Sequence, residues 1–154
     1  MIFIGADHRG FKQKEELIKF FSENLIEYFD CGNTEYNSED DFPIFAFAVT
    51  KQVLTSENSF TESKNGDWGL LICGSGEGMS IAANKAKGIR AALCSDIESA
   101  KQSRQENNCN VLVLNEKHGL QDMLDIINAF RYTDFSTDEK YARRVGMIEE
   151  YANS

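Results

Sequence analysis

The segment LLICGSGEGMSIAANK, from Leu70 to Lys85, decides the fold. It opens with an apolar run typical of a buried strand, turns through glycines at alternate positions, and continues into an Ala-rich stretch of helical character. A cysteine, Cys73, stands at the turn itself. Strand, glycine turn and helix in this order form the unit from which parallel α/β sheets are built, so we expect that architecture.

The rest of the chain repeats this alternation. Near-continuous apolar runs suit parallel strands that are buried on both faces, and stretches with helical spacing separate them. The expected strands are residues 2–6, 25–30, 69–73, 89–94 and 110–114. The first expected helix begins near Phe11, and the others cover about 43–54, 79–86, 96–106, 119–131 and 137–151. Residues 55–66 are expected to form a solvated loop. The pattern predicts one domain, 1–154, with a doubly wound five-stranded parallel sheet and helices on both faces.

Composition argues against several classes of function. The formal net charge of -9 opposes the positive field that a nucleic acid or an anionic membrane surface would require. No apolar run approaches the roughly 18 residues of a spanning helix, and residues 1–6 lack the basic flank of a signal peptide. The four cysteines, Cys31, Cys73, Cys94 and Cys109, form no CxxC pair and no Cys/His cluster. We therefore expect a cytoplasmic protein without a disulfide framework or a metal site, in which the cysteines other than Cys73 are packing residues.

Ligands of doubly wound sheets bind outside the carboxyl ends of the strands, near the point where the strand order reverses. The first strand ends in GADHRGF, which places Asp7, His8 and Arg9 in one turn. Two interpretations remain open for this turn. Its aspartate caps the following helix, or the three side chains form a polar cluster that faces a ligand.

The third strand ends in CGSGEG, and its glycines allow a sharp turn that presents successive backbone N–H groups. Together with the start of the next helix, these groups can hold a phosphate or an oxyanion, although α/β folds also use glycine simply to turn. The loop is not a P-loop, because no Lys-Ser or Lys-Thr follows it. Its GxGxG spacing after the third strand is also a poor match to a dinucleotide fingerprint.

Cys73 raises the significance of this loop. A thiol near a helix N-terminus is expected to have a lowered pKa. A thiolate beside N–H donors can remove a carbon-bound proton while the donors hold the developing enediolate oxygen. The alternative is nucleophilic attack on an acyl group, which would need a nearby histidine, and His8 is the candidate. Lys140 and Arg144, four residues apart, form either a solvated helix face paired with glutamates or a cationic site for a phosphate.

The segments GADHRGF, DFPIFA, ICGSGEGMSIAANK, GIRAALC, NNCNVLVL and ARRV follow one another over almost the whole chain. In this order they resemble the ribose-5-phosphate isomerase B family, which shares a superfamily with the galactose-6-phosphate isomerase subunits. The resemblance implies a Rossmann-like fold and a homodimer with active sites between the subunits. It also implies cofactor-free interconversion of ribose 5-phosphate and ribulose 5-phosphate, in the non-oxidative branch of the pentose phosphate pathway.

The same resemblance implies roles for individual residues. Cys73 corresponds to the base that moves a proton between C2 and C1 of the sugar, and Ser75 to the hydroxyl residue that assists it. The backbone of Gly74, Ser75, Gly76, Glu77 and Gly78 corresponds to the anion hole for the enediolate. Asp7 and His8 correspond to residues that contact the sugar and the phosphate, Asn107 to a substrate-contacting asparagine, and Arg144 to a phosphate-binding arginine.

Three positions depart from the family pattern. Glu106 stands where the family commonly has a histidine that opens the furanose ring, so Glu106 takes that acid/base role, another residue does, or the open-chain sugar is used. A carboxyl group suits this role where burial raises its pKa toward neutrality. Lys117 and Lys140 replace arginines, which keeps the charge but loses a two-pronged phosphate contact. The alternatives to a pentose-phosphate isomerase are an isomerase of a six-carbon sugar phosphate and a non-catalytic sugar-phosphate-binding protein.

Overall fold

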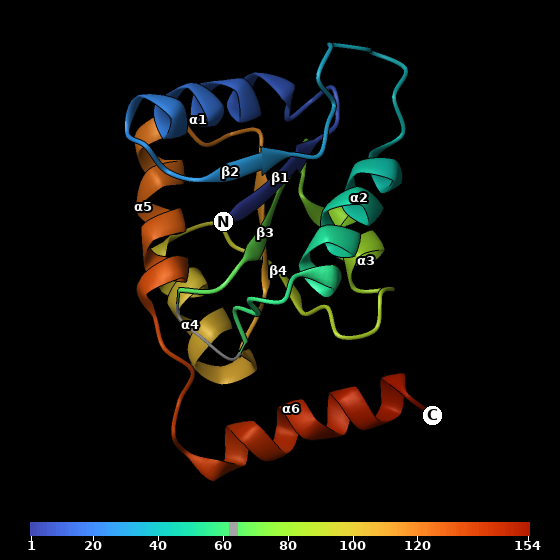
Figure 1. Cartoon of the computed structure of the whole chain (residues 1–154), viewed down its shortest axis with the longest axis vertical. Coiled ribbons are helices and arrows are strands. Elements are labelled where there is room, and N and C mark those ends of the chain that lie inside the picture. The colour runs from blue at the N-terminus through green and yellow to red at the C-terminus, as the bar shows by residue number, and fades with distance from the viewer. Residues whose placement is uncertain (62–64) are drawn as a thin grey trace.

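The computed structural model of the chain describes residues 1–61 and 65–154. In these residues, strands and helices alternate around one parallel sheet (Figure 1). The strands are β1 (Ile2–Ala6), β2 (Tyr28–Asp30), β3 (Trp68–Cys73), β4 (Ala91–Leu93) and β5 (Val111–Asn115). The helices are α1 (Phe11–Glu23), α2 (Phe42–Thr55), α3 (Glu77–Ala83), α4 (Ile97–Asn107), α5 (Leu120–Tyr132) and α6 (Glu139–Ala152).

The sheet has five strands in the order β2-β1-β3-β5-β4, and every neighbouring pair is parallel. This confirms the predicted doubly wound sheet. The chain leaves β1 for β2 on one side and returns to β3 on the other side of β1. The order therefore reverses between β1 and β3, and the carboxyl ends of these two strands are the expected place for a ligand.

Two hydrophobic clusters fill the faces of the sheet. One face is covered by α1, α4 and α5, with side chains such as Leu17, Phe21 and Phe130, and the other by α2 and α3, with Val49 and Met79. Figure 1 shows this division, with α1 and α5 on one side of the sheet and α2 and α3 on the other. Helix α6 lies apart from both layers, and none of its residues, all of which are described, is buried.

Two of the predicted strands are shorter in the structure. Strand β2 begins at Tyr28 instead of residue 25, because the chain still turns at Leu25, which has a positive φ of 56° and an exposed side chain. Strand β4 covers only Ala91–Leu93, because Ile89 belongs to the turn before it and donates its N–H to the carbonyl of Ala86. Short strands at the two edges of a sheet leave the three central strands to form the core.

The segment 55–66 was expected to be a solvated loop, and at Phe60 this expectation is wrong. Phe60 is 2% exposed, and its ring stacks on Phe130 with centroids 5.8 Å apart and lies 6.0 Å from the ring of Trp68. Burial of one large aromatic ring outweighs the polar character of its neighbours in the sequence. Residues 62–64 of this segment lie outside the described residues.

Candidate active site

The turn after β1 is organised by Asp7. One carboxylate oxygen of this buried side chain accepts the N–H groups of Arg9 and Gly10, each at 3.0 Å. Asp7 therefore orders the turn that leads into α1 but does not cap the helix, because both N–H groups precede Phe11 and no side chain of the described residues caps the helix start. The capping interpretation is wrong, and Asp7 lies beside His8 at the carboxyl edge, as the other interpretation required. Burial raises the pKa of Asp7 above its ordinary value, and the hydrogen bonds from the backbone only partly oppose this effect.

The turn after β3 wraps around the thiol of Cys73. The N–H of Gly76 donates to Cys73 Sγ at 3.2 Å, and Cys73 is 5% exposed. Gly76 has a φ of +86°, and a Cβ there would lie 2.4 Å from the Cδ1 atom of Leu93, so the turn requires glycine. Ser75 Oγ accepts the N–H of Glu77 at 3.2 Å, where α3 begins. The loop thus directs backbone N–H groups toward the sulfur, as an anion-binding loop must.

The prediction of a lowered pKa for Cys73 is wrong. Burial raises the pKa of the Cys73 thiol above its ordinary value, and the carboxylate of Asp7 raises it further. The N–H groups of Met79 and Gly76 and the charge of Arg9 lower the pKa but do not offset the cost of desolvation. The same burial effect raises the pKa of the other three thiols, and Cys94 and Cys109 are buried packing residues as predicted. Cys31 is half-buried.

Arg9 and Glu116 connect the carboxyl ends of β1, β3 and β5. Arg9 Nε donates to Glu116 Oε2 at 3.1 Å, and Arg9 Nη2 forms an ion pair with Oε1 of the same carboxylate. The guanidinium lies directly on Gly74, where an added Cβ would be 2.3 Å from Arg9 Cζ. The N–H of Glu116 donates to the carbonyl of Gly74 at 3.2 Å. The sequence analysis did not identify Glu116, and its place just beyond a strand end was the only signal available.

The predicted site residues fall into two sets. Lys117, whose N–H donates to Asn115 Oδ1 at 2.9 Å, follows β5 and so belongs to the edge that carries Cys73. We name this the carboxyl-edge set; it consists of Asp7, His8, Cys73, Gly74, Ser75, Gly76, Glu77, Gly78 and Lys117. The amino-edge set consists of Glu106, Asn107, Lys140 and Arg144.

The register of the sheet separates these sets. Cys73 pairs with Asn115, and Gly69 pairs with Val111 at the opposite end of β5. Glu106 and Asn107 end α4, before β5 begins, and the two ends of this pairing lie about 13 Å apart at the usual rise per residue. Helix α6 joins the same end, and Figure 1 shows it beneath the sheet, away from the turn after β1. One chain therefore does not bring all the predicted residues together.

A hollow of about 460 Å³ lies at the amino edge, between the end of α4 and the start of α6. Glu106 lines it and is exposed, so the burial that its proposed acid/base role requires would have to come from another chain. Lys140 Nζ pairs with Asp138 Oδ2 at 3.2 Å and lies 4.8 Å from the centroid of the Tyr141 ring. The guanidinium of Arg144 lies 5.7 Å from that centroid on the same helix, so the two cations are neighbours.

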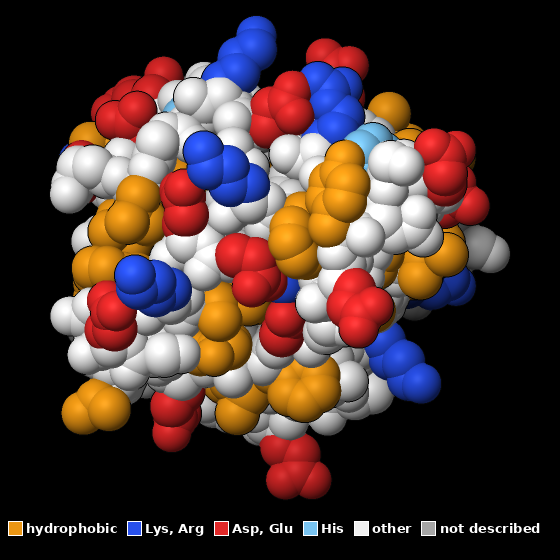
Figure 2. Space-filling view, turned by 90° about the horizontal axis from the view of Figure 1, so that it is seen from above, with side chains coloured by type: hydrophobic (Ala, Val, Ile, Leu, Met, Phe, Trp, Pro, Cys, Tyr) orange, Lys and Arg blue, Asp and Glu red, His pale blue; other side chains and the backbone are white. Residues whose placement is uncertain are grey.

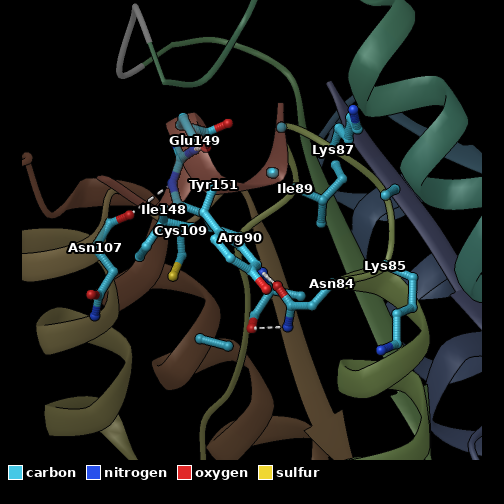
Figure 3. Close-up of a pocket in the computed structure, with 15 residues that line it drawn as sticks. Asn84, Lys85, Lys87, Ile89, Arg90, Asn107, Cys109, Ile148, Glu149 and Tyr151 are labelled. Atoms are coloured by element: carbon cyan, nitrogen blue, oxygen red, sulfur yellow. Dashed lines mark hydrogen bonds and ion pairs between the residues drawn. The ribbon is translucent and has the colours of Figure 1, made fainter. Parts of the chain in front are cut away.

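Arg90, which the sequence analysis missed, connects α6 to this edge. Its Nε donates to the carbonyl of Asn107 at 2.9 Å and its Nη2 to the carbonyl of Asn108 at 3.0 Å, while Nη1 pairs with Glu149 of α6 (Figure 3). These groups border a pocket of about 560 Å³ between α6 and the loop before β4, which Tyr151 also lines. Arg90 therefore holds Asn107 and α6 in a fixed relation.

The surface agrees with the acidic composition. In the view from above, Lys and Arg side chains are interspersed with Asp and Glu side chains and with small hydrophobic groups (Figure 2). Among the residues that the structure describes, no helix has the length and apolar character to cross a membrane.

A parallel α/β sheet with a thiol inside a glycine loop at its switch point defines a class of small-molecule enzyme sites. Comparison with known proteins makes this specific. A sequence model of the Ribose/Galactose Isomerase family matches residues 2–148. The chain belongs to this family, as the resemblance of its motifs predicted.

Individual relatives extend the similarity over nearly the whole chain. Ribose-5-phosphate isomerase B of Mycobacterium tuberculosis (strain H37Rv) is 32% identical over 151 residues, which is 97% of this chain and 88% of the relative. The crystal structure of a ribose 5-phosphate isomerase from Thermotoga maritima has a TM-score of 0.85 and 36% identity, and covers 97% of both chains. That of ribose-5-phosphate isomerase B from Mycoplasma genitalium with bound ribulose-5-phosphate has a TM-score of 0.85 and 31% identity, and covers 99% of this chain and 96% of that one.

Proposed function

We propose that this protein interconverts ribose 5-phosphate and ribulose 5-phosphate through an enediolate, with Cys73 as the base. The observation that carries the proposal is the placement of the Cys73 sulfur 3.2 Å from the N–H of Gly76, inside a loop of further N–H groups at the switch point. Relatives that carry this activity in their names, one of them with bound ribulose-5-phosphate, support the choice of substrate.

The reaction requires one proton transfer between neighbouring carbons. The Cys73 thiolate removes the proton from C2 of the aldose, and the electron pair of that C–H bond forms the C1–C2 double bond while the carbonyl oxygen becomes an oxyanion. The N–H groups of the loop stabilise this oxyanion. The thiol then returns the proton to C1, and the proton of the C2 hydroxyl passes to the oxyanion at O1. O2 thereby becomes the ketone oxygen and O1 the hydroxyl of the product, and Cys73 is again a thiolate. A thiol with a raised pKa is a stronger base once ionised, which suits abstraction of a weakly acidic carbon-bound proton.

We also propose that the active site is completed between two copies of the chain in a cytoplasmic homodimer. The carboxyl-edge set of one copy would meet the amino-edge set of its partner, which would place Arg144 near the phosphate. Helix α6 supports this arrangement, because its apolar side chains Met147, Ile148 and Tyr151 are all exposed. Ile81, 64% exposed, adds apolar surface on α3, the helix that follows the Cys73 loop. An amphipathic helix whose apolar side chains remain exposed in its own chain is typical of an interface between subunits.

Substitution Cys73→Ser tests the base. We expect ketose formation from ribose 5-phosphate to be lost while binding of the sugar phosphate is retained, because serine is nearly isosteric but much less acidic. Allose 6-phosphate assayed alongside distinguishes the six-carbon alternative. A Cys73→Ser variant as active as the wild type would contradict the role of the thiol. Saturable binding without turnover by the wild-type protein would favour the binding-protein alternative.

Mixing two inactive variants tests the shared site. Cys73→Ser removes the base from one set, and Arg144→Ala removes a phosphate contact from the other. If the sites lie between copies, unfolding and refolding the variants together yields heterodimers with one intact site. Random association then restores about one quarter of the wild-type activity, since half the dimers are mixed and each has one good site of two. Mixtures no more active than the separate variants would show that the two sets do not act across an interface.

A further inference from the structure

Asp40 holds His8 from the loop that precedes α2. Asp40 Oδ1 accepts the backbone N–H of His8 at 3.0 Å and lies 2.7 Å from Nδ1 of its ring. The other carboxylate oxygen, Oδ2, accepts Nδ2 of Asn33 at 3.1 Å. The Asp40 side chain is 6% exposed, whereas the ring of His8 is 30% exposed. A carboxylate with three hydrogen bonds therefore holds His8 at two points, the backbone N–H and Nδ1 of the partly exposed ring.

The two hydrogen bonds to Asp40 orient the His8 ring and influence its protonation. With Nδ1–H donating to Asp40, the nitrogen that remains for a ligand is Nε2. The hydrogen bond that the ring donates to Asp40 raises the pKa of His8, and the charges of Asp7 and Asp40 act in the same direction. Arg9, in the same turn, opposes them, and Glu116 at the end of β5 is close enough for its own carboxylate to be stabilised by the His8 charge. Desolvation also lowers the pKa of His8, but the net shift is upward, which widens the pH range in which the ring is an imidazolium that donates from both nitrogens.

We propose that Asp40 is a positioning residue, which holds His8 with its Nε2–H directed at the phosphate group of the substrate. The inference rests on the proposed function, because His8 belongs to the carboxyl-edge set and the resemblance to the ribose-5-phosphate isomerase B family implies that it contacts the sugar phosphate. The charges around His8 explain why this contact matters for binding the phosphate. Arg9, the neighbouring cation, already has its guanidinium occupied by Glu116, so an imidazolium held by the Asp40 carboxylate adds a donor that a phosphate dianion needs.

Substitution Asp40→Asn tests the assignment with little change in shape. The amide retains an oxygen for the backbone N–H of His8 but removes the charge that favours the imidazolium. We expect KM for ribose 5-phosphate to rise about tenfold, the scale of one hydrogen bond to a charged group, with kcat nearly unchanged because the phosphate is remote from C1 and C2. The dissociation constant of inorganic phosphate can be measured by calorimetry as a function of pH. It should begin to rise at a lower pH in the variant than in the wild type, because the His8 imidazolium of the variant loses its proton at a lower pH.

Two further variants make the test specific. Glu39→Gln removes one charge from the adjacent residue, whose exposed carboxylate accepts only Ser38 Oγ among the hydrogen bonds of the described chain, and we expect wild-type constants. In a His8→Gln background, Asp40→Asn should have no further effect on KM if it acts through His8. Full additivity of the two substitutions, or a folded Asp40→Asn variant with unchanged KM and phosphate affinity, would overturn the inference. Failure of the wild type to turn over ribose 5-phosphate would contradict the proposed function instead, and the phosphate measurement would still decide the role of Asp40.

Discussion

At the scale of single residues, the environment of Cys73 is the most informative feature of the site. Its thiol lies at the start of a helix, where a lowered pKa is common, yet burial raises its pKa. Of the charged side chains nearby, Arg9 acts to lower the pKa and Asp7 to raise it. Arg9 therefore adds to the N–H groups of Met79 and Gly76 in limiting how far burial raises the pKa of the thiol.

Substitution Arg9→Ala tests this effect. We expect the limb of the kcat profile that rises with pH to move toward higher pH, because loss of the guanidinium raises the pKa of Cys73 further. The Glu116 carboxylate, no longer paired with Arg9, acts in the same direction. The measurement is the dependence of kcat on pH under saturating ribose 5-phosphate. Lys12→Ala, a loss of charge on the exposed face of α1, is the control, and a shift of equal size in both variants would refute the explanation.

At the scale of elements, Lys14 connects α1 to β2. Its side chain is 0% exposed, and Nζ donates to Asp30 Oδ2 at 2.7 Å and to Glu15 Oε1 at 2.8 Å. Its ammonium group also lies 5.5 Å from the centroid of the Phe11 ring. Because β2 is a short edge strand, this partly buried ion pair with Asp30 is one of the contacts that hold it to the rest of the fold.

Substitution Lys14→Ala should reduce the free energy of unfolding by about 1–3 kcal/mol, because the buried side chain is removed and Asp30, which is 23% exposed, loses a hydrogen bond to a charged group. The measurement is urea denaturation at neutral pH. Lys12→Ala is again the matched control, since Lys12 is 81% exposed and lies 3.9 Å from Glu16, and its loss should leave the midpoint almost unchanged. Equal midpoints for the two variants would show that Lys14 does not stabilise the α1–β2 contact.

At the scale of the whole molecule, the buried thiols predict a loss of stability in alkali. An unfolded cysteine ionises near its ordinary pKa of 9.0, whereas burial raises the pKa of Cys94 to about 11 and that of Cys109 to about 12. Between these values the folded chain binds more protons than the unfolded chain, so the free energy of unfolding falls as pH rises. The stabilisation is complete below pH 9 and is lost progressively toward pH 12.

Comparison of Cys109→Ala with the wild type isolates this effect. The variant should be less stable near neutral pH because it leaves a small cavity, but the difference from the wild type should narrow above pH 9, at up to about 1.4 kcal/mol per pH unit. The measurement is the free energy of unfolding from denaturant titrations at several pH values. Val113→Ala, which creates a buried cavity without removing a titratable group, should instead give a constant difference. Parallel curves for both variants would contradict the linkage.

Much of the fold follows from local patterns. The strand and helix expected at 69–73 and about 79–86 are present as Trp68–Cys73 and Glu77–Ala83, because a buried apolar run and a glycine turn need no distant partner to be recognised. The helix begins two residues earlier and ends three residues earlier than expected. The boundaries of β2 and β4 were less accurate, since the ends of edge strands depend on turns that the apolar pattern does not mark. Phe60 was missed for the same reason, because its partners Trp68 and Phe130 are brought to it by the tertiary fold.

The sequence by itself determined the alternation of strands and helices, the glycine loop with its cysteine, and the family to which these motifs belong. Only the tertiary structure decided how the site is arranged. It paired His8 with Asp40 across 32 positions and Arg9 with Glu116 across 107, and it placed Arg144 at the opposite edge from Cys73. It also reversed the expected shift in the pKa of Cys73. The physical reason is common to all of these: helix and turn signals act between neighbours in the chain, whereas burial and charge act between neighbours in space.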